Sequence, residues 1–192
     1  MNDLDFTLYE DEIPKVFKSF ISEELFTHCI NCGKYLLDQD VHYLIEKAIY
    51  QGNVEFEHAI CIDCATEMRG YMSEESTKAI NDFFEKNFNQ IERMQKLFSE
   101  NESPSLEKWM EKCAISHQPI ENLSEYQIFA HCNGTKLIYS VMPFIISGEI
   151  TEKLSELLSK KTREELDDYM EKHFDLPPEM KEIFIRKKIL IH

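Results

Sequence analysis

Apolar positions recur along the chain with two different periods, which predicts a mixture of strands and helices. Apolar runs rich in β-branched and aromatic residues predict strands at 41–50 and 54–60, joined by a turn at Gly52. Farther along, apolar residues three and four positions apart predict one long helix over 74–98. Its stripe consists of Ile80, Phe84, Phe88, Ile91, Met94 and Phe98. We expect this stripe to pack within its own domain, and a homodimer formed through the 74–98 helix is the alternative.

Short helices are predicted in three other places. One begins near Pro14, where a single helical face would carry Val16, Phe17, Phe20 and Ile21. Another begins at Ser103-Pro104, a pair suited to an N-cap and a first helical position. A final helical turn is predicted after Pro177-Pro178, ahead of a basic tail at 186–188.

The second half of the chain carries its own hairpin signal. Predicted strands at 126–132 and 135–142 flank Asn133-Gly134, a dipeptide suited to a two-residue type I′ turn because both positions tolerate positive φ. Helices are predicted to follow at 152–158 and 163–174. This half therefore combines a hairpin with helices.

A polar stretch that ends in a proline, residues 99–104, is typical of a linker or a long turn. We therefore predict a first domain at 1–100 and a small α+β domain at 101–192, and we leave open whether the two share one core. No internal repeat with a fixed period is apparent. The chain has 192 residues, 43% of them hydrophobic, which is enough for a globular protein with a real core.

The chain is acidic, with 21 Lys and Arg against 36 Asp and Glu and a formal net charge of −15. Such a field repels phosphate backbones and anionic lipids, which argues against nucleic-acid binding and membrane binding. The first residues carry acids where a secretory signal needs bases, and no apolar run of about 18 residues could span a bilayer. We therefore expect a cytoplasmic protein whose six cysteines are metal ligands or core thiols rather than disulfides.

Four of the cysteines form the one specific chemical signal. Cys29 and Cys32 make one C-x2-C pair, and Cys61 and Cys64 make another. Two residues between thiols let a tight turn direct both sulfurs at one ion, and two such turns complete the all-thiolate tetrahedral shell of structural zinc. The two predicted strands fill the spacer, Gly33 favours a tight first turn, and the second pair is expected at a helix start. The sequence therefore predicts one structural Zn²⁺ per chain, with iron as the main competitor.

The order of a cysteine turn, a hairpin and a second cysteine turn at a helix start resembles treble-clef zinc fingers. Over residues 27–72, the segments 29–34 and 59–64 are similar to the four-cysteine zinc-binding domain of the Clp protease unfoldase. That resemblance implies a treble clef that holds zinc structurally and recognises adaptor or substrate proteins. The hairpin here is longer and the sequence has no ATPase P-loop, so the resemblance concerns this module alone.

Weaker constellations leave alternatives open. Cys113, His117, His131 and Cys132 are candidates for a second metal site or for a decayed copy of the first module, although consecutive strand residues point to opposite faces of a sheet. A hydrolase or nuclease is the alternative function, with a site between the two parts that uses His117, His131 or His173 with nearby acids. Transcription-associated nucleic-acid binding is a third hypothesis, opposed by the acidic charge.

Other polar residues near the cysteines are expected to be solvated surface groups: His28, His58, Glu55 and Glu57. A complete thiolate shell leaves no open coordination position for catalysis. We therefore predict a non-enzymatic α+β zinc-finger protein, in which a treble-clef module at 27–72 is extended by a long helix and contacts another protein.

Overall fold

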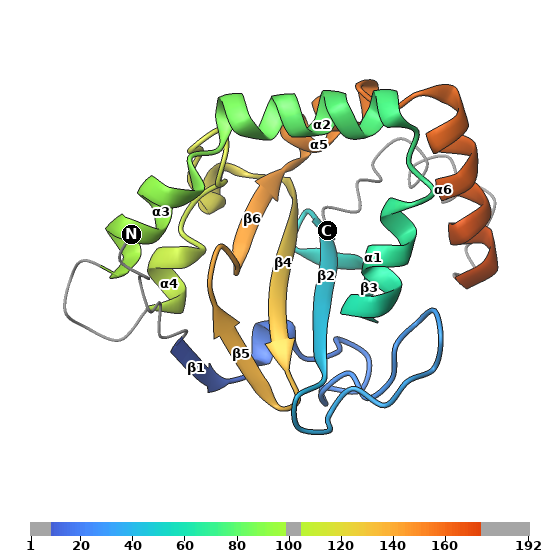
Figure 1. Cartoon of the computed structure of the whole chain (residues 1–192). Helices are drawn as coiled ribbons and strands as arrows, with labels where there is room; N and C mark the ends of the chain where they lie inside the picture. The colour runs from blue at the N-terminus through green and yellow to red at the C-terminus, as the bar shows by residue number, and fades with distance from the viewer. Residues whose placement is uncertain (1–8, 99–104, 174–192) are drawn as a thin grey trace, which may run out of the picture.

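A single antiparallel sheet of six strands forms the centre of the structure, a computed structural model that describes residues 9–98 and 105–173 (Figure 1). The strand order is β1-β5-β4-β2-β3, and β6 pairs with β4 beyond the end of β5. The strands are β1 (Tyr9–Glu12), β2 (His42–Tyr50), β3 (Asn53–Cys61), β4 (Glu125–Asn133), β5 (Lys136–Tyr139) and β6 (Phe144–Ser147).

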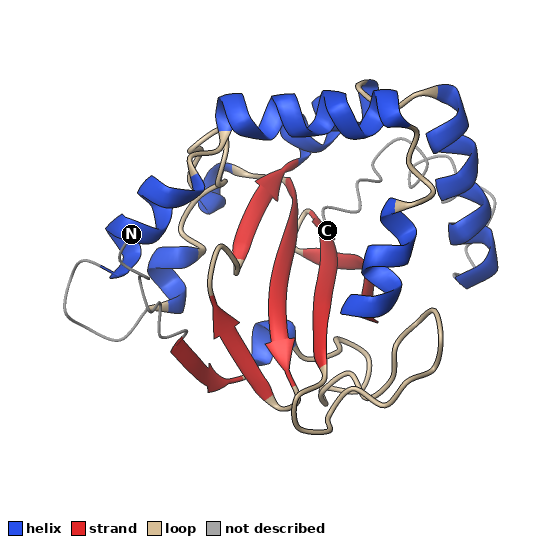
Figure 2. Cartoon of the chain, viewed as in Figure 1, coloured by secondary structure: helices blue, strands red, loops and turns tan. Residues whose placement is uncertain are grey.

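Helices pack around this sheet, which gives the α+β class that the sequence predicts (Figure 2). They are η1 (Lys15–Phe17), α1 (Ile62–Arg69), α2 (Glu74–Asn87), α3 (Gln90–Phe98), α4 (Leu106–Trp109), η2 (Ile120–Asn122), α5 (Gly148–Glu156) and α6 (Lys160–His173). In the part of the chain described, no helix has both the length and the apolar character needed to cross a bilayer.

Strands from both halves of the chain lie in the same sheet. The central ladder joins β2 to β4 over their whole length, from the His42–Asn133 pair to the Tyr50–Glu125 pair. The two buried hydrophobic clusters each contain residues from before and after the 99–104 segment, which lies outside the described residues. The division into domains 1–100 and 101–192 stays a prediction. Within the described residues, the two halves contribute to the same hydrophobic core.

The first predicted hairpin is confirmed, because β2 and β3 occupy the expected segments around a turn with positive φ at Gln51 and Gly52. The second hairpin is also present, but its turn is shifted by one residue. Asn133 pairs with Lys136, so the two turn residues are Gly134 and Thr135 rather than Asn133-Gly134. Only Gly134 has positive φ, as in a type II′ turn, so the type I′ prediction is wrong.

Of the strand predicted at 135–142, only β5 forms, and β6, which the sequence pattern did not predict, follows it; both strands pair with β4. Residues between them leave the ladder, where the Ser140 amide donates to the Met142 carbonyl and Pro143 has no amide hydrogen to offer. The helices of the second half begin earlier than predicted, at Gly148 and Lys160. The predicted start at Ser103-Pro104 and everything predicted after residue 173 lie outside the described residues.

The helix predicted at 74–98 is two helices, because the chain breaks at Phe88 and Asn89. Phe88 has extended backbone angles, and the Asn89 side chain caps the next helix by accepting from the Glu92 amide at 3.0 Å. The apolar residues of α2 pack against the core of the same chain, as expected. Beyond the break Ile91 is 71% exposed, and a homodimer formed through this segment stays a prediction.

The prediction of an amphipathic helix near Pro14 is wrong. The segment forms only the 3₁₀ turn η1, in which Phe17 is buried, while Phe20 and Ile21 are 65% and 89% exposed on the loop that follows. Four apolar residues at helical spacing therefore do not share a buried face.

Alanine at Gly134 is expected to destabilise the fold more than alanine at Gly52. Both glycines have positive φ, which costs other residues about 1–2 kcal/mol. A Cβ at Gly134 would also lie 3.0 Å from the Asp38 carbonyl oxygen, whereas one at Gly52 meets nothing within 4 Å. Urea unfolding should therefore show the larger loss of free energy for Gly134→Ala, and equal losses would contradict this packing.

Candidate metal centre

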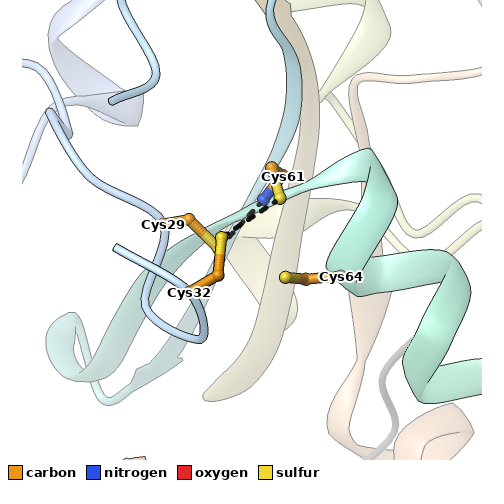
Figure 3. A group of neighbouring side chains, drawn as sticks. All are labelled: Cys29, Cys32, Cys61 and Cys64. Atoms are coloured by element: carbon orange, nitrogen blue, oxygen red, sulfur yellow. Dashed lines mark hydrogen bonds between the residues drawn. The ribbon is translucent and has the colours of Figure 1, made fainter. Parts of the chain in front are cut away.

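The four sulfur atoms of Cys29, Cys32, Cys61 and Cys64 converge, all lying within 4.8 Å of one another (Figure 3). With Zn–S bonds of about 2.3 Å, the sulfurs of a regular tetrahedron are about 3.8 Å apart. The Cys32 and Cys61 sulfurs are 3.8 Å apart, far beyond the roughly 2.05 Å of a disulfide, and all four cysteines are free thiols. The donor set therefore fits a metal ion of this size.

A tight backbone turn presents the first pair. The Cys29 amide donates to the Lys34 carbonyl, and the Gly33 amide donates to the Cys29 carbonyl, both at 2.9 Å. Gly33 has a φ of 72°, which glycine adopts without strain. The sequence expectation for Gly33 is confirmed, and the turn places Cys29 in the interior and Cys32 at the surface.

The second pair lies where β3 runs directly into α1. Cys61 is the N-cap of the helix and Cys64 lies in its first turn, as the sequence predicts. Unpaired amides and the positive end of the helix dipole favour thiolates at such a position. Asp63 in the same turn pairs with Lys34 at 3.1 Å, which links the two cysteine turns across an exposed surface.

Hydrogen bonds favour the thiolate of Cys29. Burial would raise the pKa of this thiol, but backbone amides of Cys32, Cys61 and Asn31 outweigh burial and lower it to about 7. The Cys61 amide lies 3.4 Å from the Cys29 sulfur. Burial raises the pKa of the Cys61 and Cys64 thiols. A bound cation would favour the deprotonated form of all four, since only thiolates ligate metals.

Helix α6 covers the buried side of the centre. Tyr169 is 8% exposed, and burial together with the neighbouring Cys29 and Cys64 raises the pKa of its hydroxyl. His173, at the end of this helix, donates through Nδ1 to the Ile30 carbonyl at 3.1 Å, within the first cysteine turn. The second half of the chain therefore contributes to the surroundings of the metal centre.

A buried polar pair near the centre contradicts one sequence expectation. His58 is only 2% exposed, as is Glu46 opposite it on β2, so the interpretation of His58 as a surface imidazole is wrong. Their side chains approach to 3.9 Å between His58 Nε2 and Glu46 Oε2. His28 is exposed, as expected. The signal that could have found the pair is the cross-strand register, which places residues 46 and 58 side by side.

The stability of the fold should depend on pH through Glu46. Burial raises the pKa of its carboxyl well above the usual value, so the folded chain keeps a proton that the unfolded chain releases near pH 4.3. The folded state is therefore favoured at low pH and loses this contribution as the pH rises through the folded pKa. Glu46→Gln has no such proton to lose, and urea unfolding should show it gaining stability relative to wild type from about pH 5 to 8. A difference that stays constant over this range would contradict the assignment.

Glu57 also departs from its expected role as a solvated acid. Its carboxylate pairs with Lys47 at 2.9 Å, and the two side chains are only 10% and 4% exposed. The same carboxylate accepts from the Ser19 hydroxyl and the Phe20 amide, both at 2.8 Å. Glu57 therefore holds the loop after η1 against the sheet.

The histidines proposed for an alternative site have separate surroundings. His131 contacts His42 at 3.0 Å, His173 contacts the first cysteine turn, and His117 follows Cys113 on an exposed turn. In residues 9–98 and 105–173, the four-cysteine cluster is the one group of three or more His, Cys, Asp or Glu side chains close enough to share an ion. Cys113, His117, His131 and Cys132 therefore do not assemble into the second metal site considered above.

Comparison of the chain with protein-family models, with curated proteins and with solved structures found no match. The resemblance of residues 27–72 to the Clp zinc-binding domain accordingly rests on the cysteine spacing alone.

Proposed function

We propose that the protein binds one structural zinc ion through Cys29, Cys32, Cys61 and Cys64, and that this zinc module presents a surface to a partner protein. The observation that carries the first part is the convergence of four sulfurs within 4.8 Å. Four thiolates satisfy tetrahedral zinc completely, which leaves no position for a substrate or an activated water. The role of the ion is then to stabilise the fold.

The order of elements supports a treble-clef assignment for this module. A tight cysteine turn is followed by the β2–β3 hairpin, and the second pair begins α1. The zinc would join a surface turn to the start of a helix, two segments separated by a whole hairpin. Such a crosslink stabilises a fold because it holds together parts that are far apart in sequence.

The loop after η1 offers a surface for a protein partner. Phe20 and Ile21 are 65% and 89% exposed on this loop. The nearly buried Glu57 carboxylate holds the loop against the sheet through its hydrogen bonds with the loop. A preformed apolar tip loses little conformational entropy on docking. The net charge of −15 favours a partner with basic residues around the pocket that receives the tip.

Removal of the zinc with a chelator distinguishes an ion that stabilises the fold from an ion that does not. Removal of zinc under reducing conditions should lower the midpoint of thermal unfolding, and restored zinc should raise it again. Zinc removal without an effect on unfolding would contradict a structural role.

The partner surface is tested with Phe20→Ser/Ile21→Ser in the full chain. The variant should keep its zinc and its fold but lose the proteins that co-purify with the wild type from the source cell. Ile91→Ser is the matched control, because Ile91 is also highly exposed and lies on α3. Unchanged co-purification by the double variant would contradict this docking surface.

A further inference from the structure

The first cysteine turn has a counterpart at residues 112–119. Cys113 donates its amide to the Gln118 carbonyl at 2.9 Å, as Cys29 does to Lys34. The His117 amide donates to the Cys113 carbonyl at 3.0 Å, and His117 has a φ of 58°, so it repeats the role of Gly33. The flanking bridges also match, since His28 pairs with Tyr35 and Lys112 pairs with Pro119. The backbone of the cysteine turn is therefore present twice.

Each turn meets its own hairpin in the same way. The Cys61 amide lies 3.4 Å from the Cys29 sulfur, and the Ser147 amide lies 3.3 Å from the Cys113 sulfur. Cys61 ends β3 and is the N-cap of α1, while Ser147 ends β6 and is the N-cap of α5. The ladders match as well, because Cys61 lies opposite Tyr43 and Ser147 lies opposite Tyr126.

The helices that follow complete the correspondence. Helices α2 and α6 each have 14 residues. Ser73, the N-cap of α2, donates its amide to Thr162 Oγ1 at 3.0 Å, and Ser159 donates its amide to Ser76 Oγ at 2.8 Å. The hydroxyls of Ser73 and Ser159 themselves lie 2.8 Å apart. Bonds that are reciprocal in this way are those expected across a two-fold axis.

We infer that residues 112–173 are a second copy of residues 28–87 whose metal site has lost three of its four ligands. The inference rests on the proposed zinc site in the first copy. Superposing the contacts assigns Cys113 to the position of Cys29. Ser116, Ser147 and Ile150 then take the positions of Cys32, Cys61 and Cys64, in that order.

The second copy is held together without an ion. The Cys113 sulfur is fully buried and accepts from the Ser116 and Ser147 amides at 3.4 and 3.3 Å. The two serine hydroxyls lie 3.5 Å apart, and Ile150, 4% exposed, packs in the hydrophobic cluster beneath α2. Hydroxyl groups and an aliphatic side chain are poor ligands for zinc, so this copy replaces a metal crosslink by hydrogen bonds and packing.

The test restores the three missing thiols with Ser116→Cys/Ser147→Cys/Ile150→Cys. We expect this variant to bind one more zinc per chain than the wild type, measured by elemental analysis after gel filtration under reducing conditions. With Co²⁺ as the probe, the thiolate charge-transfer absorption should double. The measured quantity is the number of zinc ions per chain that the variant gains relative to the wild type. A wild type without zinc would therefore overturn the proposed function, whereas a folded triple variant without the gain would overturn this inference.

A matched control carries three new cysteines at exposed positions of the same turn and helix, Gln118→Cys/Glu149→Cys/Glu152→Cys. It should bind no more zinc than the wild type, and an equal gain in this control would overturn the assignment of ligand positions. If the triple variant does not fold, Ser116→Cys/Ser147→Cys keeps Ile150 and supplies three thiols. This variant is expected to take up one additional Co²⁺ per chain with thiolate charge transfer, and its failure to do so when folded would overturn the inference.

Discussion

Cys64→Ser should release the zinc and destabilise the whole fold, because a serine hydroxyl does not replace a thiolate in this centre. Structural zinc contributes about 10–16 kcal/mol of apparent binding free energy in small zinc fingers, comparable to the total stability of a domain. Even if Cys64→Ser lost only about 4 kcal/mol of unfolding free energy, the unfolding midpoint of a protein of this length would fall by roughly 8–16 °C. Zinc analysis and thermal unfolding of the purified variant measure both effects.

Cys132→Ala is the matched control for Cys64→Ser. Cys132 is a fully buried thiol on β4, outside the cluster of four. Its replacement removes one buried sulfur and should cost about 1 kcal/mol of packing while zinc content stays unchanged. If Cys64→Ser keeps its zinc, or loses no more stability than Cys132→Ala, the four-cysteine centre is not a structural metal site.

Lys47→Met should cost about 3–5 kcal/mol, the typical penalty for removing one partner of a buried ion pair. The change leaves the Glu57 carboxylate nearly buried without its cation, which is 2.9 Å away in the wild type. Burial acts to raise the pKa of Glu57, and Lys47 together with the Phe20 amide and the Ser19 hydroxyl lowers it overall. A carboxyl with a lowered pKa stabilises the fold above its unfolded pKa and loses that contribution as the pH falls. Urea unfolding should therefore show a larger cost at pH 7 than at pH 4.

A double-mutant cycle tests whether the ion pair itself accounts for that cost. Lys47→Met/Glu57→Gln removes both charges but keeps an acceptor for the Phe20 amide. It should recover most of the stability that Lys47→Met loses, because no uncompensated charge remains. If the two single costs simply add in the double variant, the pair does not act as a unit and the loop after η1 is held by other contacts.

The sequence was most informative where one local rule decides the structure. Strands β2, β3, β4 and β5 follow from apolar runs beside turn residues, and the clustering of the four cysteines follows from two C-x2-C pairs with a hairpin between them. Each hairpin and each cysteine pair depends on residues close together in sequence. The helix stripe before residue 88 packs as expected for the same reason.

Other features depend on contacts that the pattern does not encode. The helical spacing of apolar residues continues past Asn89, although the chain does not continue as one helix. The Asn89 side chain caps a new helix there, so the predicted helix is divided in two. The burial of His58 and Glu57 follows from their cross-strand partners, which only the register of β2 and β3 identifies.

From the sequence, a decayed copy of the first module is only one alternative, on Cys113, His117, His131 and Cys132, and two physical reasons hide its extent. Three of the four ligand positions carry residues of different chemistry, so the metal signature is absent at 113–150. The second hairpin is also longer, with β4 paired to both β5 and β6, which shifts the helices relative to a fixed repeat. Backbone hydrogen bonds keep the correspondence that side chains have lost.

X-ray absorption at the zinc edge, on the full-length protein purified under reducing conditions, tests the central claim most directly. The four-cysteine centre predicts about one zinc per chain with a first shell of four sulfurs near 2.3 Å and no nitrogen or oxygen ligand. Protein that contains no zinc, or a zinc shell with light-atom ligands, would contradict the centre and the structural role argued from it.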